Sequence, residues 1–215
     1  MSDNKLIGII DTGTSNIMSV LHACNLYSIK FKIIKEYHNT DGIDGLIIPG
    51  VGSYRAVMEN LKRKKLDHFI YECIDLKKPS LFICIGLQIL FESSDEFGKN
   101  RGLSIFNGKI RKIPNLIKGK MRNVPMIGWN KLNINFKSDL LQDIDENSYF
   151  FFTHSFYADV QDRSIIQSEV NYNGFNYCSS IESKNIYATQ FHPEKSGLEG
   201  VKIYKNFYKI VNQID

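Results

Sequence analysis

Residues 79–92 read Pro79-Ser80-Leu81-Phe82-Ile83-Cys84-Ile85-Gly86-Leu87-Gln88-Ile89-Leu90-Phe91-Glu92. The first six residues are typical of a buried strand and the rest of an amphipathic helix, so Cys84 lies at a strand-to-helix junction. A sharp turn at such a junction lifts the central side chain clear of the sheet, which is the geometry of a nucleophile elbow. The helix N-terminus favours a thiolate and offers free backbone N–H groups. Gly86 permits a tight turn with little bulk near the sulfur.

A histidine and a carboxylate follow near the end of the chain, in Thr189-Gln190-Phe191-His192-Pro193-Glu194. Pro193 restricts His192 to extended backbone, and residues two apart in an extended chain point to the same side. Glu194 can therefore orient the imidazole and leave its other ring nitrogen for Cys84. Lys195 is a cation and cannot take this role. Either a lone cysteine or a lone histidine is more often structural, but together Cys84, His192 and Glu194 predict a nucleophilic enzyme.

The segment Pro49-Gly50-Val51-Gly52 ends another expected strand at the same carboxyl edge of the sheet. Its glycines allow a backbone N–H to turn toward a developing oxyanion, so Gly50, Val51 and Gly52 are candidates for an oxyanion hole. The alternative is an ordinary strand-to-helix turn. A phosphate loop is disfavoured because no lysine or Ser/Thr stands at the required spacing.

The composition is that of a globular protein of one domain, residues 1–215, with 43% hydrophobic and 23% charged residues and a net charge of +4. The basic run Lys62-Arg63-Lys64-Lys65 favours a solvated helix face over a nucleic-acid patch. Four separated cysteines without a CxxC pair argue against a zinc site or disulfides, and Cys24, Cys73 and Cys178 are expected in the core. No metal or cofactor is expected. No apolar stretch suits a signal peptide or a membrane span, so we expect a cytoplasmic protein.

Alternating apolar and helical patterns predict an α/β fold with a mostly parallel central sheet flanked by helices and a β-rich second half. Strands are expected at residues 6–10, 31–34, 45–48, 79–84, 108–113, 129–136, 149–153, 164–170, 175–181 and 185–191. Helices are expected at residues 16–27, in one segment containing Met58, Leu61, Leu66, Phe69 and Ile70, and at the end of the chain. The last helix is expected to start with a capping box, Ser196-Gly197-Leu198-Glu199, and to bury Leu198, Val201, Tyr204, Phe207 and Val211.

The motifs described above, in their order and spacing, resemble those of class I (triad) glutamine amidotransferases. Further segments are similar to the glutaminase subunits of imidazole glycerol phosphate synthase: Ile10-Asp11-Thr12-Gly13 with Asn16, Gly128-Trp129-Asn130, Phe152-Thr153-His154-Ser155 and His192-Pro193-Glu194-Lys195-Ser196. The resemblance runs nearly from end to end. It implies that Cys84 attacks the carboxamide of L-glutamine, that N–H groups near Val51 and Leu87 hold the oxyanion, and that His192 protonates the departing ammonia. It also assigns Gln88 and Glu96 to glutamine binding, although both also suit an ordinary polar helix surface.

The resemblance implies a partner as well, because the chain has no room for a domain that accepts ammonia. A (β/α)8 cyclase subunit would form a heterodimer with it and use the ammonia to make imidazole glycerol phosphate and AICAR in histidine biosynthesis. Asn16, Trp129 and Lys195 are expected at this interface, and glutaminase activity is expected to be low until the partner binds. Neither a nucleic acid nor a membrane is expected as a partner.

The sequence departs from the family pattern at Phe82, where a glycine is usual, and at Met126, where a histidine is usual. Thr12 and Ser15 also differ. These changes leave the pathway open, so a paralogous glutaminase that feeds another acceptor, such as surface-sugar amidination, remains an alternative. A cysteine hydrolase of another class is a second alternative, although such relatives often place histidine directly after the nucleophile, where this chain has Ile85. A catalytically silent assembly subunit is a third.

Overall fold

The computed structural model describes residues 5–38, 40–117 and 119–213. Its centre is an eight-stranded sheet in the order β11-β14-β15-β16-β4-β3-β1-β2. The bounds are β11 Asn133–Ile134, β14 Ile166–Tyr172, β15 Phe175–Ser183, β16 Ile186–Thr189, β4 Ser80–Cys84, β3 Gly45–Gly50, β1 Ile7–Ile10 and β2 Phe31–Ile34. The strands run parallel from β16 to β2 and antiparallel from β11 to β16.

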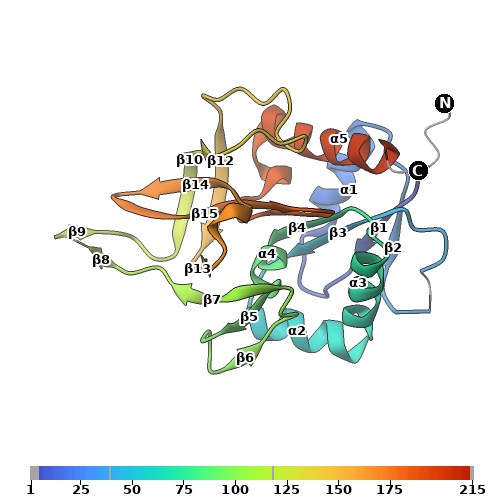
Figure 1. Cartoon of the computed structure of the whole chain (residues 1–215), viewed down its shortest axis with the longest axis horizontal. Helices are drawn as coiled ribbons and strands as arrows, with labels where there is room; N and C mark the ends of the chain where they lie inside the picture. The colour runs from blue at the N-terminus through green and yellow to red at the C-terminus, as the bar shows by residue number, and fades with distance from the viewer. Residues whose placement is uncertain (1–4, 39, 118, 214–215) are drawn as a thin grey trace.

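Helices cover both faces of the parallel strands (Figure 1). On one face lie α1 (Ile17–Leu26) and α5 (Gly197–Gln213), and on the other lie α2 (Tyr54–Arg63) and α3 (Leu66–Asp75). Every residue of β1, β3, β4 and β16 is buried. Parallel strands covered on both faces read as continuous apolar runs, which explains why the sequence pattern identified them.

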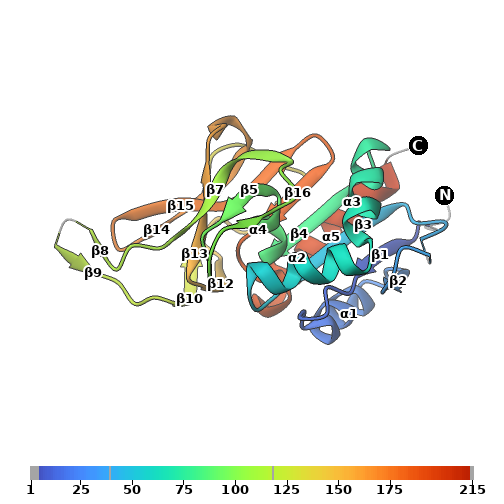
Figure 2. The same cartoon turned by 90° about the horizontal axis from the view of Figure 1, so that it is seen from below.

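The second half of the chain adds smaller sheets beside the central one (Figure 2). One has the order β13-β7-β5-β6, another pairs β10 with β12, and a third is the projecting hairpin β8-β9. Their bounds are β5 Phe91–Ser94, β6 Asn100–Arg101, β7 Phe106–Lys112, β8 Leu116–Ile117, β9 Lys120–Met121, β10 Met126–Lys131, β12 Tyr149–His154 and β13 Phe156–Val160. A short helix α4, Ile85–Ile89, and two 3-10 turns, η1 Arg163–Ile165 and η2 Pro193–Lys195, complete the described elements. The β-rich second half is therefore confirmed, although β5, β6, β8, β9 and β13 were not expected.

The single helix expected between β3 and β4 is two helices, and that expectation is wrong. Ser53 caps α2 by accepting the N–H of Ala56 at 3.3 Å, and the chain breaks at Lys65, which has φ 56°. The apolar spacing explains the break, because Leu61 and Leu66 would lie on different faces of a continuous helix. Because one helix ends before Lys65 and a new one begins after it, the side chains of Leu61 and Leu66 both point into the core, where each is fully buried.

The helix after Cys84 is also shorter than expected, and it is buried on all sides rather than amphipathic. Its carbonyls are taken by a neighbouring loop: Leu103 N–H donates to Ile89 O at 2.7 Å, and Ile105 N–H donates to Leu90 O at 2.8 Å. The chain therefore leaves the helix and enters strand β5. The expected strand 129–136 is likewise divided into β10 and β11.

The capping box expected at the start of α5 is absent from the described structure. The Ser196 hydroxyl donates to His192 O at 2.7 Å, and the Glu199 carboxylate pairs with Lys202 at 2.6 Å. Leu198 is 82% exposed and does not belong to the apolar stripe, whereas Tyr204, Phe207 and Val211 are buried as expected.

Within the described residues, no helix combines the length and the apolar character needed to traverse a lipid bilayer.

Phe82 lies in the middle of β4 and is fully buried. Its Cβ stands 3.4 Å from the position that a Cβ on Gly86 would occupy, so Phe82 lies next to α4. We predict that Phe82→Gly lowers the free energy of unfolding by roughly 3–5 kcal/mol, because it empties a buried aromatic site. Denaturant unfolding measures this change. Phe82→Leu, which keeps most of the volume, should cost roughly 1 kcal/mol. Equal stability of Phe82→Gly and the wild type would show that Phe82 does not support α4.

Candidate active site

Cys84 stands at the carboxyl end of β4, where the chain turns abruptly into α4. Its backbone has φ 56° and ψ −106°, a conformation that non-glycine residues rarely adopt. The turn brings α4 so close to β3 that a Cβ on Gly86 would lie 2.3 Å from the Ile48 carbonyl oxygen. Only glycine fits there, so the local sequence Cys84-Ile85-Gly86 produces the sharp strand-to-helix turn that was predicted.

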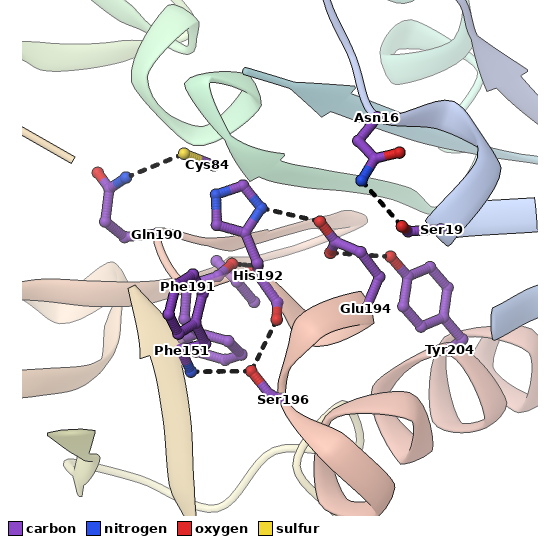
Figure 3. Close-up of polar contacts among 11 residues, drawn as sticks. Asn16, Ser19, Cys84, Phe151, Gln190, Phe191, His192, Glu194, Ser196 and Tyr204 are labelled. Carbon is purple, nitrogen blue, oxygen red and sulfur yellow. Dashed lines mark hydrogen bonds and ion pairs between the residues drawn. The ribbon is translucent and has the colours of Figure 1, made fainter. Parts of the chain in front are cut away.

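His192 approaches from the segment that follows β16. Its Nδ1 lies 2.8 Å from Oε1 of Glu194, and the two side chains are 1% and 3% exposed (Figure 3). His192 has extended backbone, as expected, but Glu194 reaches the ring through the 3-10 turn η2 rather than along an extended chain. The fully buried Tyr204 of α5 donates its hydroxyl to the other carboxylate oxygen at 3.4 Å. Glu194 is thereby held on both oxygens.

Nε2 of His192 is buried, and among the described residues no group forms a hydrogen bond with it. Burial is the largest single influence on this ring and lowers the pKa of His192. The nearby Cys84 sulfur and the Glu194 carboxylate together outweigh it and hold the pKa of His192 well above its usual range. The ring can therefore carry a proton on Nε2 at neutral pH, on the side of the ring away from Glu194.

A second histidine, His154, lies in the same region and behaves differently. It is buried, and burial lowers the pKa of His154 to about 4. Its Nδ1 lies 2.8 Å from Phe156 O, and its Nε2 lies 3.2 Å from the Tyr177 hydroxyl. His154 is therefore a neutral structural group at physiological pH, and His192 is the ring suited to proton transfer.

A cavity of about 350 Å³ opens beside Cys84 and His192. The other residues that line it are Asn16, Val51, Gly52, Ile85, Gln88, Glu96, Pro125, Thr153, His154, Ser155, Phe156 and Lys195. A cavity of this size suits a small molecule with a few polar groups.

Most of the residues singled out in the sequence meet at this cavity. Val51 and Gly52 line it, whereas Gly50 and Leu87 are buried behind it. Gly50 packs on the first turn of α4, because a Cβ on it would lie 2.9 Å from Ile85 Cβ. The Pro49–Gly52 loop and the helix N-terminus are therefore neighbours, as a shared oxyanion hole would require.

The two residues assigned to glutamine binding also line the cavity. Gln88 is 2% exposed, so it does not belong to a polar helix surface. Glu96 comes from the turn after β5, and its Oε2 accepts the Tyr54 N–H at 2.6 Å.

The expected partner residues are divided between the cavity and the outer surface. Asn16 and Lys195 line the cavity, and Trp129 is 52% exposed on β10. Trp129 lies opposite Phe151 of β12 and contacts its ring at 5.7 Å between centroids.

Sequence reasoning missed several polar residues of the site. Ser196 links His192 to Phe151, because its hydroxyl donates to His192 O and accepts the Phe151 N–H at 2.9 Å (Figure 3). Gln190 places its amide nitrogen 3.7 Å from the Cys84 sulfur. A register argument from the two parallel strands could have located Gln190, whereas no local signal identified the partners of Ser196.

In residues 5–38, 40–117 and 119–213, no group of three or more His, Cys, Asp or Glu side chains is arranged to hold a metal ion.

Comparison with known proteins identifies the family of the chain. The family model described as glutamine amidotransferase class-I matches residues 8–211. Two solved structures from Thermotoga maritima share the fold. PurLQS, with a TM-score of 0.73 and 17% identity, covers 96% of this chain and 99% of its own. A glutamine amidotransferase, with a TM-score of 0.62 and 14% identity, covers 98% of this chain and 86% of its own. The fold class expected from the sequence is confirmed.

Curated relatives are considerably more similar in sequence. The imidazole glycerol phosphate synthase subunit HisH of Prochlorococcus marinus (strain MIT 9312) is 40% identical over 94% of this chain and 96% of its own length. The protein of the same name from Methanocaldococcus jannaschii is 39% identical over 96% of this chain and 100% of its own length. That from Dehalococcoides mccartyi (strain CBDB1) is 36% identical over 95% of this chain and 97% of its own length. The chain therefore belongs to the class-I glutamine amidotransferases, in the family of the imidazole glycerol phosphate synthase subunit HisH.

Proposed function

We propose that this chain hydrolyses L-glutamine to glutamate and ammonia, and that it delivers the ammonia to the (β/α)8 cyclase subunit of imidazole glycerol phosphate synthase in histidine biosynthesis. The observation that carries the proposal is the buried His192–Glu194 pair beside Cys84 at the cavity. Membership of the HisH family supports the substrate and the pathway.

In the first step, the Cys84 thiolate adds to the carbon of the substrate carboxamide, and the carbonyl electron pair moves onto oxygen. The oxyanion would be held by backbone N–H groups of the Gly50–Gly52 loop and of the α4 N-terminus near Leu87. The first N–H groups of a helix have no partner within it, so α4 can supply such donors.

In the second step, His192 donates its Nε2 proton to the amide nitrogen, the C–N bond breaks and ammonia leaves. The raised pKa of His192, which its neighbours maintain against burial, favours the protonated ring that this step needs. Neutral His192 then takes a proton from water, which attacks the glutamyl thioester. Collapse releases glutamate and restores the thiolate and the protonated ring.

Gln88 and Glu96 would hold the amino-acid end of the substrate. The Glu96 carboxylate lines the cavity, and the Tyr54 N–H binds one of its oxygens. Its other oxygen can then pair with the α-ammonium group of glutamine, since a carboxylate accepts several hydrogen bonds.

The cyclase would dock over the cavity mouth and β10, where Asn16, Lys195 and the exposed Trp129 lie. An exposed tryptophan suits the centre of an interface, and a carboxylate on the partner could pair with Lys195. The same proposal places the chain in the cytoplasm and gives it no nucleic-acid or membrane partner.

We predict that Cys84→Ala and Cys84→Ser each reduce glutamate release by the complex on the order of a thousandfold or more, because no other group forms the thioester. An enzymatic glutamate assay in the presence of the cyclase measures this, and circular dichroism checks folding. Cys73→Ala, far from the cavity in α3, should retain turnover. Full activity in a folded Cys84→Ala protein would eliminate the proposed nucleophile.

We predict that an electrophilic glutamine analogue alkylates Cys84 in preference to the other three cysteines. Burial raises the pKa of Cys24 to about 12 and that of Cys73 to about 11, and it raises the pKa of Cys178 still further. These thiols stay protonated and unreactive at neutral pH. Peptide mass spectrometry gives the labelling of each cysteine separately, and equal labelling of all four would count against the assignment.

We predict that the isolated chain hydrolyses glutamine slowly and that binding of the cyclase speeds the reaction. Trp129→Ala should weaken partner affinity by roughly tenfold or more, as loss of an aromatic anchor does, and Lys195→Ala should reduce the stimulation. Steady-state glutamate release with and without the partner tests both variants. Leu76→Ala, which removes an exposed side chain at the end of α3, is the matched control. Turnover by the lone chain at the rate of the complex would exclude activation by docking.

A further inference from the structure

Gln190 occupies a place that the mechanism described above does not use. Strand β16 runs parallel to β4 with Thr189 opposite Ile83, so the next residue of each strand brings Gln190 beside Cys84. The Gln190 side chain is fully buried, and its backbone N–H is fixed on Ser179 O at 2.8 Å. Its Nε2 lies 3.7 Å from the Cys84 sulfur (Figure 3). The nucleophile thus has an amide neighbour from the adjacent strand.

A second glutamine determines which way this amide faces. Gln88 Nε2 donates to Phe156 O at 3.0 Å and to Gln190 Oε1 at 3.1 Å. A backbone carbonyl can only accept hydrogen bonds, so the amide of Gln88 must present its nitrogen to Phe156. The same nitrogen then requires an oxygen from Gln190. The nitrogen of Gln190 is left facing the sulfur, and the reverse orientation would set two NH₂ groups against each other.

We propose that Gln190 is a further residue of the reaction, and that its amide, oriented by Gln88 and the Phe156 carbonyl, donates a hydrogen bond that stabilises the Cys84 thiolate. The inference deepens the proposed glutaminase function and rests on it. The three groups Phe156 O, Gln88 and Gln190 are named here the amide relay. Gln88 Nε2 donates both to Phe156 O and to Gln190 Oε1, so Gln190 accepts with its oxygen and donates with its nitrogen, and the Cys84 sulfur is the acceptor at the end of the relay.

The physical effect follows from the difference between a thiol and a thiolate. A thiol sulfur is a weak acceptor, whereas a hydrogen bond to a charged group stabilises that charge. The charged or titratable groups around Cys84 are His192, His154, Glu96 and Lys195, which line the same cavity, with Glu194 behind His192. Protonated His192 and Lys195 favour the thiolate, and Glu96 opposes it. Gln190 adds a donor that does not titrate.

Gln190 does not line the cavity, so it would act on the sulfur rather than on bound glutamine. Its loss should therefore reduce kcat and leave KM nearly unchanged, whereas a general loss of cavity shape would raise KM.

The direct test is alkylation of Cys84 by iodoacetamide in the isolated, full-length chain, followed by peptide mass spectrometry from mildly acidic to mildly alkaline pH. In Gln190→Met, which has a similar volume and no donor, the alkylation rate at neutral pH should fall about fivefold to tenfold, and the rate–pH profile should shift to higher pH. In Gln190→Glu the alkylation rate should fall further, because a negatively charged carboxylate, which only accepts hydrogen bonds, would face the sulfur.

Gln167→Met is the matched control. Gln167 is 2% exposed in β14, and its amide donates to Phe136 O at 3.1 Å, away from Cys84. Its variant loses a comparable buried amide and should alkylate like the wild type. A rate and profile equal to wild type in folded Gln190→Met would overturn the proposal.

A second variant serves if Gln190→Met fails to fold. Gln88→Met breaks the relay one link earlier and should slow alkylation by a smaller factor, and unchanged alkylation in this folded variant would also overturn the proposal. Iodoacetamide labelling needs no glutaminase activity. A wild-type complex that releases no glutamate would refute the proposed function, and the labelling experiment would still decide on the relay.

Discussion

The close approach of α4 to strand β3 is the constraint on which the site depends. Strand β4 is held in register between β3 and β16, so the chain can enter α4 only by turning abruptly at Cys84. Gly86 allows the helix to lie against the Ile48 carbonyl. The left-handed backbone of Cys84 costs about 1–3 kcal/mol, which the burial of the whole of α4 offsets. A side chain at position 86 would move the helix outward and change where the sulfur points.

His192 is positioned by a different part of the fold. His192 N–H donates to Phe151 O at 2.9 Å, and the Ser196 hydroxyl bridges His192 O and Phe151 N–H. These hydrogen bonds tie the histidine backbone to β12, whose partner β10 carries Trp129 opposite Phe151. Trp129 is therefore connected through β12 to the segment that carries His192, whereas Cys84 belongs to the central sheet. The proposed activation by a docked partner would use this connection.

The features that could be predicted from the sequence are those determined by residues close together in the chain. The strand, turn and glycine around Cys84 are adjacent, and His192 and Glu194 are two residues apart, so short-range patterns identified both. The contacts that escaped prediction join distant segments: Gln88 and Gln190 are separated by 102 positions, and Phe151 and Ser196 by 45. Ser196 is the clearest example. Its neighbours in the sequence predicted a helix cap, but its hydroxyl accepts a hydrogen bond from the N–H of Phe151 on the distant strand β12. Helix α4 ended early for the same reason, since the loop at Leu103 takes its carbonyls.

The donors around the sulfur must also be of limited strength. A hydrogen bond that stabilises a thiolate makes it easier to form but less nucleophilic, so a short, strong bond would hinder attack. The 3.7 Å separation between the Gln190 nitrogen and the Cys84 sulfur is longer than an N–H···O hydrogen bond because sulfur is the larger atom, and a single neutral N–H donor would give a modest stabilisation. His192 differs from Gln190 because it can transfer its proton to the leaving nitrogen once the sulfur has bonded to carbon. In the proposed mechanism the site thus combines one donor that gives up its proton, His192, with one that keeps it, Gln190, and only His192 needs a nearby carboxylate to adjust its basicity.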